Sequence, residues 1–218
     1  MDNQQLANLR REYQLGRLTR ADLTANPFIL LETWLDDAKN ANIPDPSAFV
    51  LGTVNAQGQA SQRIVLMKGL DAGQGTLNFF TNYESQKAQE IAHNPQVSIL
   101  FPWYMIERQV IATGVVSKLS STDSERYFYS RPKESQIAAI ASSQSSTLNS
   151  KTTLLDKYNK LLLQYQNETV PFPKNWGGFQ IKINQIEFWQ GGEHRLHDRF
   201  RYTVQNTNNS WSIDRISP

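Results

Sequence analysis

The densest group of chemically active side chains lies in one stretch, residues 188–199, which reads FWQGGEHRLHDR. A Gly-Gly pair follows an aromatic run and precedes two histidines and two arginines, His194, Arg195, His197 and Arg199. Two histidines could hold a metal ion, but the intervening arginines disfavour a cation, and no further ligand cluster stands nearby. A cationic loop of this kind suits an anion or an electron-rich ring, and a purely structural loop is the alternative.

Two shorter segments could each hold a phosphate group. Ser85 and Lys87 stand at a predicted helix start, where free N–H groups and the helix dipole attract anions. A solvated lysine is the alternative there. Tyr127 and Arg131 lie four residues apart on one predicted helix face, and Ser135 opens the next helix, which makes a second candidate cradle. The alternative is an ordinary helix end whose arginine offsets the dipole.

A further pair of cations flanks an apolar run, from Arg63 to Lys68. Side chains on a strand alternate between its two faces. Arg63 and Lys68 are five positions apart, so they are expected on opposite sides unless a bulge intervenes. That parity suits two separate anions better than one shared anion. The alternative is that both side chains reach solvent from the ends of an apolar strand.

The composition of the whole chain excludes several kinds of chemistry. The 218 residues include no cysteine, which excludes disulfides, thiolate catalysis and zinc–thiolate or iron–sulfur sites. A formal net charge of +2 argues against a nucleic-acid partner. No catalytic triad, P-loop or GxGxxG motif is found and no metal is expected, so redox chemistry would need an organic cofactor. A polar N-terminus and the lack of a long apolar run predict a cytoplasmic protein with no membrane partner.

The elements that must position these residues are a mixture of helices and strands. Leu6, Leu9 and Tyr13 are spaced as one stripe of a short N-terminal helix. Asn26 can cap a second helix at 27–38, and Thr122 and Glu125 form a capping box for a helix at 123–130. Further helical patterns cover 85–93, 134–141 and 150–166. Strand patterns cover 48–54, 61–70, 76–81, 97–103, 108–119, 177–183, 185–190, 199–204 and 211–216, the first two joined by a polar turn at 55–58. Together they predict one α+β domain, mainly β, built on a small barrel or sandwich.

Several strings of the sequence resemble the pyridoxine 5'-phosphate oxidase family over nearly the whole chain. They are LRREY, QRIVLMK, FFTN, SQKA, LFPW, ERQV, YFYSRP, ESQIAA, QSS, W-x-IDRISP and the long, irregular FWQGGEHRLHDR. The resemblance implies an FMN-binding split β-barrel with flanking helices, and a homodimer with FMN in two clefts between the subunits. Within a single domain of residues 1–218, we expect the barrel core at about 45–120, a helical insertion at about 121–167 and C-terminal dimerisation strands at about 176–218.

The resemblance also implies a role for each candidate residue. The positions that line FMN are Arg63, Ile64, Val65, Leu66, Met67, Lys68, Phe80, Thr81, Lys87, Gln109, Gln144, Ser145, Trp189 and Arg199. The positions that hold the substrate phosphate are Lys68, Tyr127, Arg131 and Ser135. Those at the substrate ring are Arg195, Leu196 and His197. A segment that folds over the substrate contains Arg10, Arg11, Glu12 and Tyr13. Asp45 matches an acidic residue near the reacting carbon, so Arg195, His197 and Asp45 are the expected catalytic residues.

Two positions depart from the family pattern. Gln86 stands where many relatives have arginine, so one guanidinium contact to the FMN phosphate is lost or replaced by an amide. A charge-assisted hydrogen bond is worth about 1.5–3 kcal/mol, which predicts weaker FMN binding without loss of function. Phe80 in place of the commoner tyrosine is a milder change, because the backbone can make contacts there.

The reaction that the resemblance implies is the oxidation of pyridoxine 5'-phosphate and pyridoxamine 5'-phosphate to pyridoxal 5'-phosphate. A hydride would pass from C4' to FMN, and dioxygen would be reduced to hydrogen peroxide. One alternative is a related flavin oxidase of another aromatic metabolite, such as a phenazine precursor, which would not use the cradle of Tyr127, Arg131 and Ser135. The other is a non-catalytic FMN- or pyridoxal phosphate-binding protein, which would not need Arg195 and His197.

Overall fold

The computed structural model describes residues 2–9, 11–205 and 210–218, so the predicted covering residue Arg10 lies outside the described part. The chain forms two compact units. The terminal unit consists of Met1–Val50, Ser98–Thr113 and Ile183–Pro218, and the central unit of Leu51–Val97 and Gly114–Lys182. Each unit is described by itself below.

The described helices and strands follow a mixed order along the chain. The terminal unit holds α1 (Asn3–Ala7), η1 (Arg20–Asp22), α2 (Pro27–Asn40), η2 (Tyr104–Ile106), η3 (Glu193–Arg195), β8 (Asp198–Val204) and β9 (Trp211–Arg215). The central unit holds β2 (Ala60–Leu66), β3 (Gly69–Asp71), β4 (Thr76–Asn82), α3 (Gln86–His93), α4 (Ser121–Ser130), α5 (Lys133–Ala141) and α6 (Lys151–Gln164). Residues of β1 (Ala48–Val54), β5 (Gln96–Phe101), β6 (Arg108–Lys118) and β7 (Trp176–Gln190) occur in both units.

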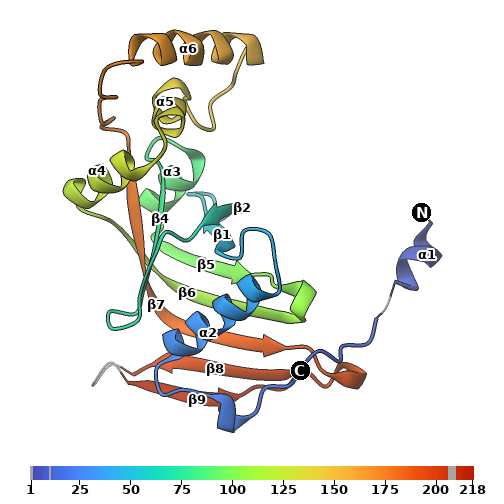
Figure 1. Cartoon of the computed structure of the whole chain (residues 1–218). Coiled ribbons are helices and arrows are strands. Elements are labelled where there is room, and N and C mark those ends of the chain that lie inside the picture. Colours follow the sequence, from blue (N-terminus) through green and yellow to red (C-terminus); the bar gives the residue numbers. More distant parts are fainter. Residues whose placement is uncertain (1, 10, 206–209) are drawn as a thin grey trace. The chain divides into compact units, whose positions relative to one another are not determined.

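The strands pair in the order β2-β1-β5-β6-β7-β4-β3, while β8 pairs with β7 and β9 (Figure 1). Strands β4 and β7 run antiparallel with Phe79 opposite Phe179, and these two buried rings stack with centroids 5.5 Å apart. In the terminal unit β7 and β8 run antiparallel with Phe188 opposite Phe200, both fully buried. Apolar residues at every second position supply these core faces. The predicted α+β, mainly β class is confirmed.

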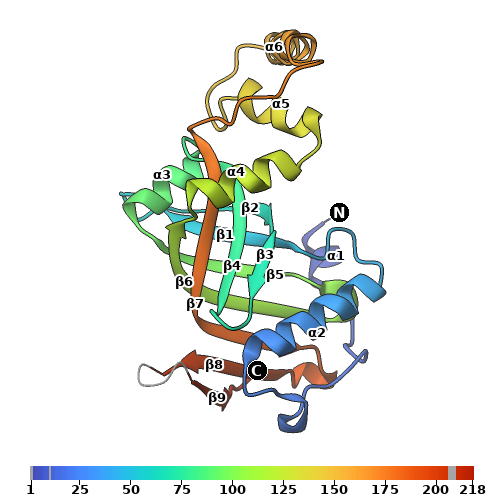
Figure 2. The same ribbon diagram turned by 60° about the vertical axis from the view of Figure 1, so that its left-hand side comes forward.

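The helices of the central unit provide a second, smaller core. Buried Phe128, Ile137, Val170 and Trp176 form a cluster to which α4, α5 and the start of β7 contribute. Helices α5 and α6 lie side by side (Figure 2). Two of these helices begin at a local signal. Ser120 caps α4 by accepting the Asp123 N–H, and Pro132 precedes α5.

Two helix predictions were wrong. The N-terminal helix ends at Ala7, so Tyr13 lies beyond it; this short helix has a capping box of Asp2 and Gln5 but no buried residue to extend it. The predicted capping box of Thr122 and Glu125 is absent from α4, because the helix begins two residues earlier and Ser120 is the cap. By contrast, α2 begins as predicted after Asn26, whose side chain accepts the Phe28 N–H.

Two strand predictions were also wrong. The run 61–70 is divided into β2 and β3 at Met67 and Lys68, and the Lys68 N–H donates to the Asn78 carbonyl at 2.8 Å. The runs 177–183 and 185–190 form the single strand β7. Polar Asn184 does not interrupt β7, because its side-chain oxygen accepts a hydrogen bond from the Thr113 hydroxyl at 2.8 Å. Within the described residues, no helix is long and apolar enough to cross a membrane.

Candidate functional site

The central unit contains a cavity of about 560 Å³, here called the central cavity. Strands β2 and β4, the start of β7, helices α3 to α5 and the loop after α5 supply its walls. Its lining residues are Arg63, Ile64, Val65, Leu66, Lys68, Phe80, Thr81, Lys87, Tyr127, Arg131, Pro132, Ser135, Gln144 and Trp176. The structure therefore brings together three cationic segments that lie far apart in the sequence. Trp176 and Pro132 were not among the predicted site residues.

Arg63 and Lys68 both line this cavity, contrary to the expected placement on opposite sides. The expectation assumed one continuous strand, but β2 ends at Leu66 and Lys68 belongs to the segment before β3. Alternation between faces applies only within a strand, so the parity argument does not extend to Lys68. Met67, between the two, is buried and does not line the central cavity.

Lys87, in the first turn of α3, is a buried cation at one end of the cavity. Its Nζ donates to Gln144 Oε1 at 2.8 Å, to Thr81 Oγ1 at 3.2 Å and to Ser85 Oγ at 3.3 Å. Burial, together with the nearby charge of Arg63, lowers the pKa of Lys87 to about 8. A buried cation that is held by neutral groups suits an anionic ligand. The solvated-lysine alternative is excluded, since Lys87 is 8% exposed.

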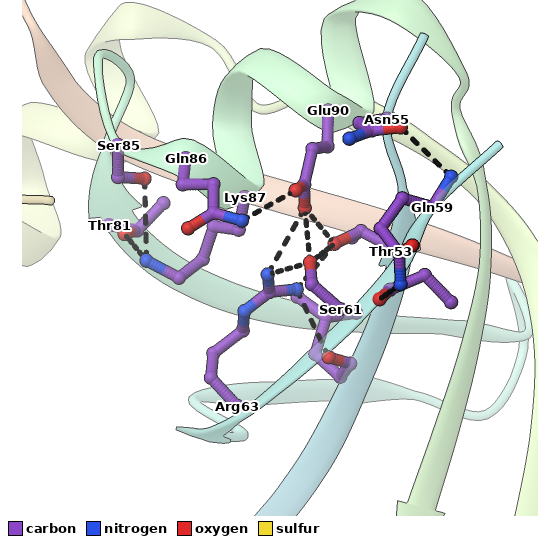
Figure 3. A network of polar contacts seen from close by, with 12 residues as sticks. Thr53, Asn55, Gln59, Ser61, Arg63, Thr81, Ser85, Gln86, Lys87 and Glu90 are labelled. Carbon is purple, nitrogen blue, oxygen red and sulfur yellow. Dashed lines mark hydrogen bonds and ion pairs between the residues drawn. The ribbon is translucent and has the colours of Figure 1, made fainter. Parts of the chain in front are cut away.

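Arg63, on β2, lines the same cavity close to Lys87. Figure 3 shows its guanidinium among Thr53, Ser61 and Glu90. Its Nη2 donates to Ser61 Oγ at 2.6 Å and to Glu90 Oε2 at 3.1 Å. Its Nη1 donates to the Leu51 carbonyl at 3.2 Å and to the Thr53 hydroxyl. The guanidinium is therefore held on two sides by the protein itself.

Glu90, on α3, is a buried carboxylate in this otherwise cationic region. It accepts hydrogen bonds from Arg63, from the Ser61 hydroxyl at 2.7 Å, from the Thr53 hydroxyl and from Gln86 Nε2 at 2.8 Å. Burial would raise the pKa of Glu90, but these hydrogen bonds outweigh it and hold the pKa at about 2. Sequence reasoning missed this residue; its spacing of four from Gln86 on a helix was the available signal.

Aromatic rings and a second guanidinium form the other end of the cavity. Tyr127 stacks on Phe80 with ring centroids 3.7 Å apart, and Arg131 lies over the Trp176 ring at 4.7 Å. Arg131 Nη1 is buried and has no hydrogen-bond partner among the described residues. Burial lowers the pKa of Arg131 and raises that of Tyr127. An unpartnered buried guanidinium N–H is costly, so a ligand acceptor is the natural partner here.

The terminal unit has a cavity of its own of about 360 Å³, here called the terminal cavity. It is lined by Leu9, Arg11, Glu12, Tyr13, Trp189, Arg195 and His197. The Tyr13 ring meets Trp189 edge-on at 5.7 Å and His197 at 5.5 Å, and Trp189 and His197 lie 4.7 Å apart. The predicted covering segment and the cationic loop thus meet at one place. Among the described residues, no cluster of metal ligands occurs.

The backbone of the cationic loop is tightly constrained. His194 and Arg195 have positive φ angles of 55° and 64°, and the His194 N–H donates to Glu12 Oε2 at 3.2 Å. His197 Nδ1 accepts the Gly192 N–H at 3.2 Å, so this nitrogen carries no proton. Burial, with the charges of Arg195 and Arg199, lowers the pKa of His197. We therefore expect an uncharged imidazole at neutral pH, with its proton on Nε2.

The remaining predicted site residues line neither cavity. In the terminal unit, Asp45 and Leu196 are exposed, and Asp45 has a φ of 48°. Gln109 is partly buried on β6, and Arg199 forms an ion pair with Glu187 at 2.7 Å. In the central unit, Ser145 has a φ of 70° and lines a separate pocket of about 260 Å³ between α5 and α6. Their roles stay predictions.

Solved structures with this fold define the class of protein. PhzG from Burkholderia lata 383, in complex with tetrahydrophenazine-1-carboxylic acid, matches with a TM-score of 0.85 and 26% identity, over 92% of this chain and 98% of that one. An FMN binding protein related to pyridoxamine 5'-phosphate oxidase, from Nostoc punctiforme PCC 73102, matches with a TM-score of 0.70 and 15% identity, over 90% and 100%. The fold is that of the split-barrel proteins related to pyridoxamine 5'-phosphate oxidase, as predicted.

Sequence comparison identifies the family within that class. Residues 35–165 match the family described as pyridoxamine 5'-phosphate oxidase, and residues 176–218 match the pyridoxine 5'-phosphate oxidase C-terminal dimerisation region. Relatives named pyridoxine/pyridoxamine 5'-phosphate oxidase, from Salmonella paratyphi B and Salmonella newport, are each 51% identical over 215 residues, covering 99% of this chain and 97% of theirs. The chain belongs to the pyridoxine/pyridoxamine 5'-phosphate oxidase family.

Proposed function

We propose that this chain oxidises pyridoxine 5'-phosphate and pyridoxamine 5'-phosphate to pyridoxal 5'-phosphate, with FMN as cofactor and dioxygen as electron acceptor. The observation that carries the proposal is the buried, unpartnered Nη1 of Arg131 in a cavity that also holds Lys87. Two cationic positions in one aromatic-lined cavity suit two phosphorylated ligands with flat rings. Membership of the family supports the same reaction.

The residues at the Lys87 end of the central cavity fit an FMN phosphate. Lys87 and Arg63 offer charge, Thr81 and Gln144 offer polar atoms, and the first turn of α3 offers free N–H groups. Ile64, Val65, Leu66, Lys68 and Phe80 supply further walls. FMN, when bound, supplies the group that accepts a hydride from the substrate and passes electrons to dioxygen. Met67, Gln109, Ser145, Trp189 and Arg199 are proposed as further FMN contacts on the family resemblance.

The Arg131 end of the cavity is proposed to hold the substrate phosphate. Arg131 would donate through Nη1, and Tyr127, Ser135 and Lys68 would add a phenol, a hydroxyl and an ammonium group. Stacking of Arg131 on Trp176 and of Tyr127 on Phe80 limits the rotamers of both side chains before any ligand binds. Such preorganisation raises affinity and orients the substrate.

The cationic loop of the terminal unit is proposed to act on the substrate ring. Arg195 would hold the substrate and assist proton removal, with His197 as its partner and Leu196 beside them. The neutral His197 can donate from Nε2, because Nδ1 is occupied by the Gly192 N–H. Asp45 is proposed to lie near the reacting carbon. Glu12, Tyr13 and Arg11 would cover the site and exclude water, which strengthens the electrostatic interactions within it.

The proposed working form is a homodimer with FMN between its subunits. Its support is the match of residues 176–218 to a dimerisation region of this family. We propose further that the whole chain acts as one functional domain, in which residues 121–167 form a helical insertion. Helices α4, α5 and α6 fall within that range.

The absorption spectrum of the purified protein tests cofactor and reaction together. We expect a flavin spectrum that is bleached under anaerobic conditions by pyridoxine 5'-phosphate and restored by air. Peroxide formation should match the pyridoxal 5'-phosphate produced. A protein that binds FMN tightly but is not bleached by either phosphorylated vitamer would contradict the oxidase proposal and favour a non-catalytic binder.

A rival function is suggested by the similarity to PhzG, a protein solved with a phenazine-type ligand. Arg131→Met distinguishes the two, because a substrate without phosphate has no use for that guanidinium. We expect KM for pyridoxine 5'-phosphate to rise roughly 10- to 100-fold, the range of a lost charge-assisted hydrogen bond. The matched control is Arg126→Met, since Arg126 is an exposed arginine of α4, the helix that ends just before Arg131, and it pairs with Asp123. Equal effects of both variants, or an unphosphorylated aromatic as the better substrate, would favour the rival.

A further inference from the structure

A negative charge lies beside the cationic end of the central cavity, where Glu90 is bonded to the lining residue Arg63. Glu90 is 5% exposed and extends from the second turn of α3 toward Arg63 (Figure 3). A buried carboxylate near a phosphate site is unfavourable for phosphate binding, because like charges repel more strongly where water is excluded. A carboxylate beside a proposed phosphate site therefore needs a structural role that offsets this repulsion.

The hydrogen bonds of Arg63 supply that explanation. A guanidinium has five N–H donors, and four of those in Arg63 are used by the protein. Nη1 bonds the Leu51 carbonyl and the Thr53 hydroxyl, while Nη2 bonds Ser61 and Glu90. Within the described residues, Nε is left as the donor that a ligand could use. Arg63 is thus held in one orientation, and both terminal nitrogens of its guanidinium are bonded to protein groups, with Nη2 paired to Glu90.

Gln86 is part of the same arrangement. Its amide Nε2 donates to Glu90 Oε1 at 2.8 Å, one helical turn away. The Gln86 side chain therefore binds Glu90 and not an open phosphate site. The cluster of Arg63, Lys87 and Glu90 carries one net positive charge, since Gln86 adds none.

We propose that Glu90 is a positioning residue that fixes Arg63 and reduces the attraction of this site for phosphate, and so sets how strongly the protein prefers FMN to riboflavin. The inference rests on the proposed function, because it assigns this end of the cavity to the FMN phosphate. The four hydrogen bonds that keep the pKa of Glu90 at about 2 keep the carboxylate charged at neutral pH. The charged groups that face it are Arg63 and Lys87.

The test is the affinity of the ligand-free protein for FMN and for riboflavin, measured by quenching of flavin fluorescence at neutral pH. Riboflavin has the same ring but no phosphate, so it reports the rest of the site. For Glu90→Gln we expect the FMN dissociation constant to fall roughly tenfold, as expected for one lost like-charge interaction. The dissociation constant of riboflavin should change by less than about twofold, because uncharged riboflavin is insensitive to that charge.

The control is Glu84→Gln, the same substitution at an exposed residue just before α3. It should leave the FMN to riboflavin ratio unchanged, because an exposed charge is screened by water and salt. Parallel changes in both affinities of Glu90→Gln, or weaker FMN binding with normal riboflavin binding, would overturn the inference. If the wild-type protein itself shows no preference for FMN, the proposed function fails instead.

A second variant keeps the test decisive if Glu90→Gln does not fold. In Gln86→Arg the new guanidinium can pair with Glu90 at i,i+4 and compete with Arg63 for it. We expect the FMN to riboflavin preference to rise in this variant, and to rise more when it is combined with Glu90→Gln, because Glu90 no longer neutralises the added charge. An unchanged preference in Gln86→Arg would overturn the inference.

Discussion

We expect Lys87 to make the proposed FMN binding sensitive to pH. Its pKa of about 8 arises from burial and from the nearby Arg63 charge. Lysine is cationic below its pKa, and a phosphate with a second pKa of about 6 is a dianion throughout the range above neutrality. As the pH rises through 8, the free protein loses the positive charge of Lys87, which is proposed to bind the phosphate. We expect FMN affinity to fall about tenfold between pH 7 and pH 9, measured by fluorescence titration.

Two lysine variants isolate this effect. Lys87→Met should weaken FMN binding at pH 7 and remove most of its dependence on pH. Lys118→Met removes an exposed lysine of the same unit, which lies over the Tyr83 ring, and should keep the full pH dependence. A wild-type affinity that is flat from pH 7 to pH 9 would show that Lys87 stays charged without a ligand.

One buried carboxylate makes two of the contacts that hold the N-terminal segment. Glu107, 4% exposed, pairs with Arg11 at 3.4 Å and accepts the Leu15 N–H at 2.9 Å. Its own carbonyl accepts the Gly191 N–H at 2.7 Å, next to the place where Tyr13 covers that glycine. A Cβ on Gly191 would come within 2.9 Å of the Tyr13 side chain, so close contact requires glycine. Glu107 thereby connects the covering segment with the cationic loop.

Limited proteolysis tests this connection. In Glu107→Gln the ion pair with Arg11 is lost, so the segment should detach more often. We expect trypsin to cleave after Arg11 and Arg17 roughly tenfold faster than in the wild type, the effect of one weakened charge-assisted hydrogen bond. Glu32→Gln, at an exposed position of α2, serves as the matched control and should be cleaved at the wild-type rate. Equal rates in both variants would show that other contacts hold the segment.

The whole molecule is expected to work as a pair of chains. Residues 176–218, which match the dimerisation region, include β7, β8 and β9. Light scattering during gel filtration should give twice the 24.9 kDa mass of one chain, at micromolar concentration and with FMN bound. Dilution that separates the chains should release FMN, because the proposed site lies between them. A monomer that keeps FMN and full turnover would contradict the dimeric site.

Local signals determined most of the helices and strands. Asn26 and Pro27 predict the start of α2, and alternating apolar residues predict β1 with its observed bounds. The failures occurred where local patterns were ambiguous, as at Ser120 and Thr122, either of which could cap α4. The break after Leu66 also has no local marker, since it follows from the pairing of Lys68 with Asn78 across the sheet.

By itself, the sequence determined the family, the cationic segments and the residue types available for chemistry, because these depend on identity and short spacing. Only the tertiary structure decided that Arg63, Lys68, Lys87 and Arg131 line one cavity. It also decided that the negative charge of Glu90 lies beside these cations, since its partners Arg63 and Thr53 are 27 and 37 residues away in the chain. Burial and long-range pairing set the charge of a site, and neither is encoded in any short stretch of residues.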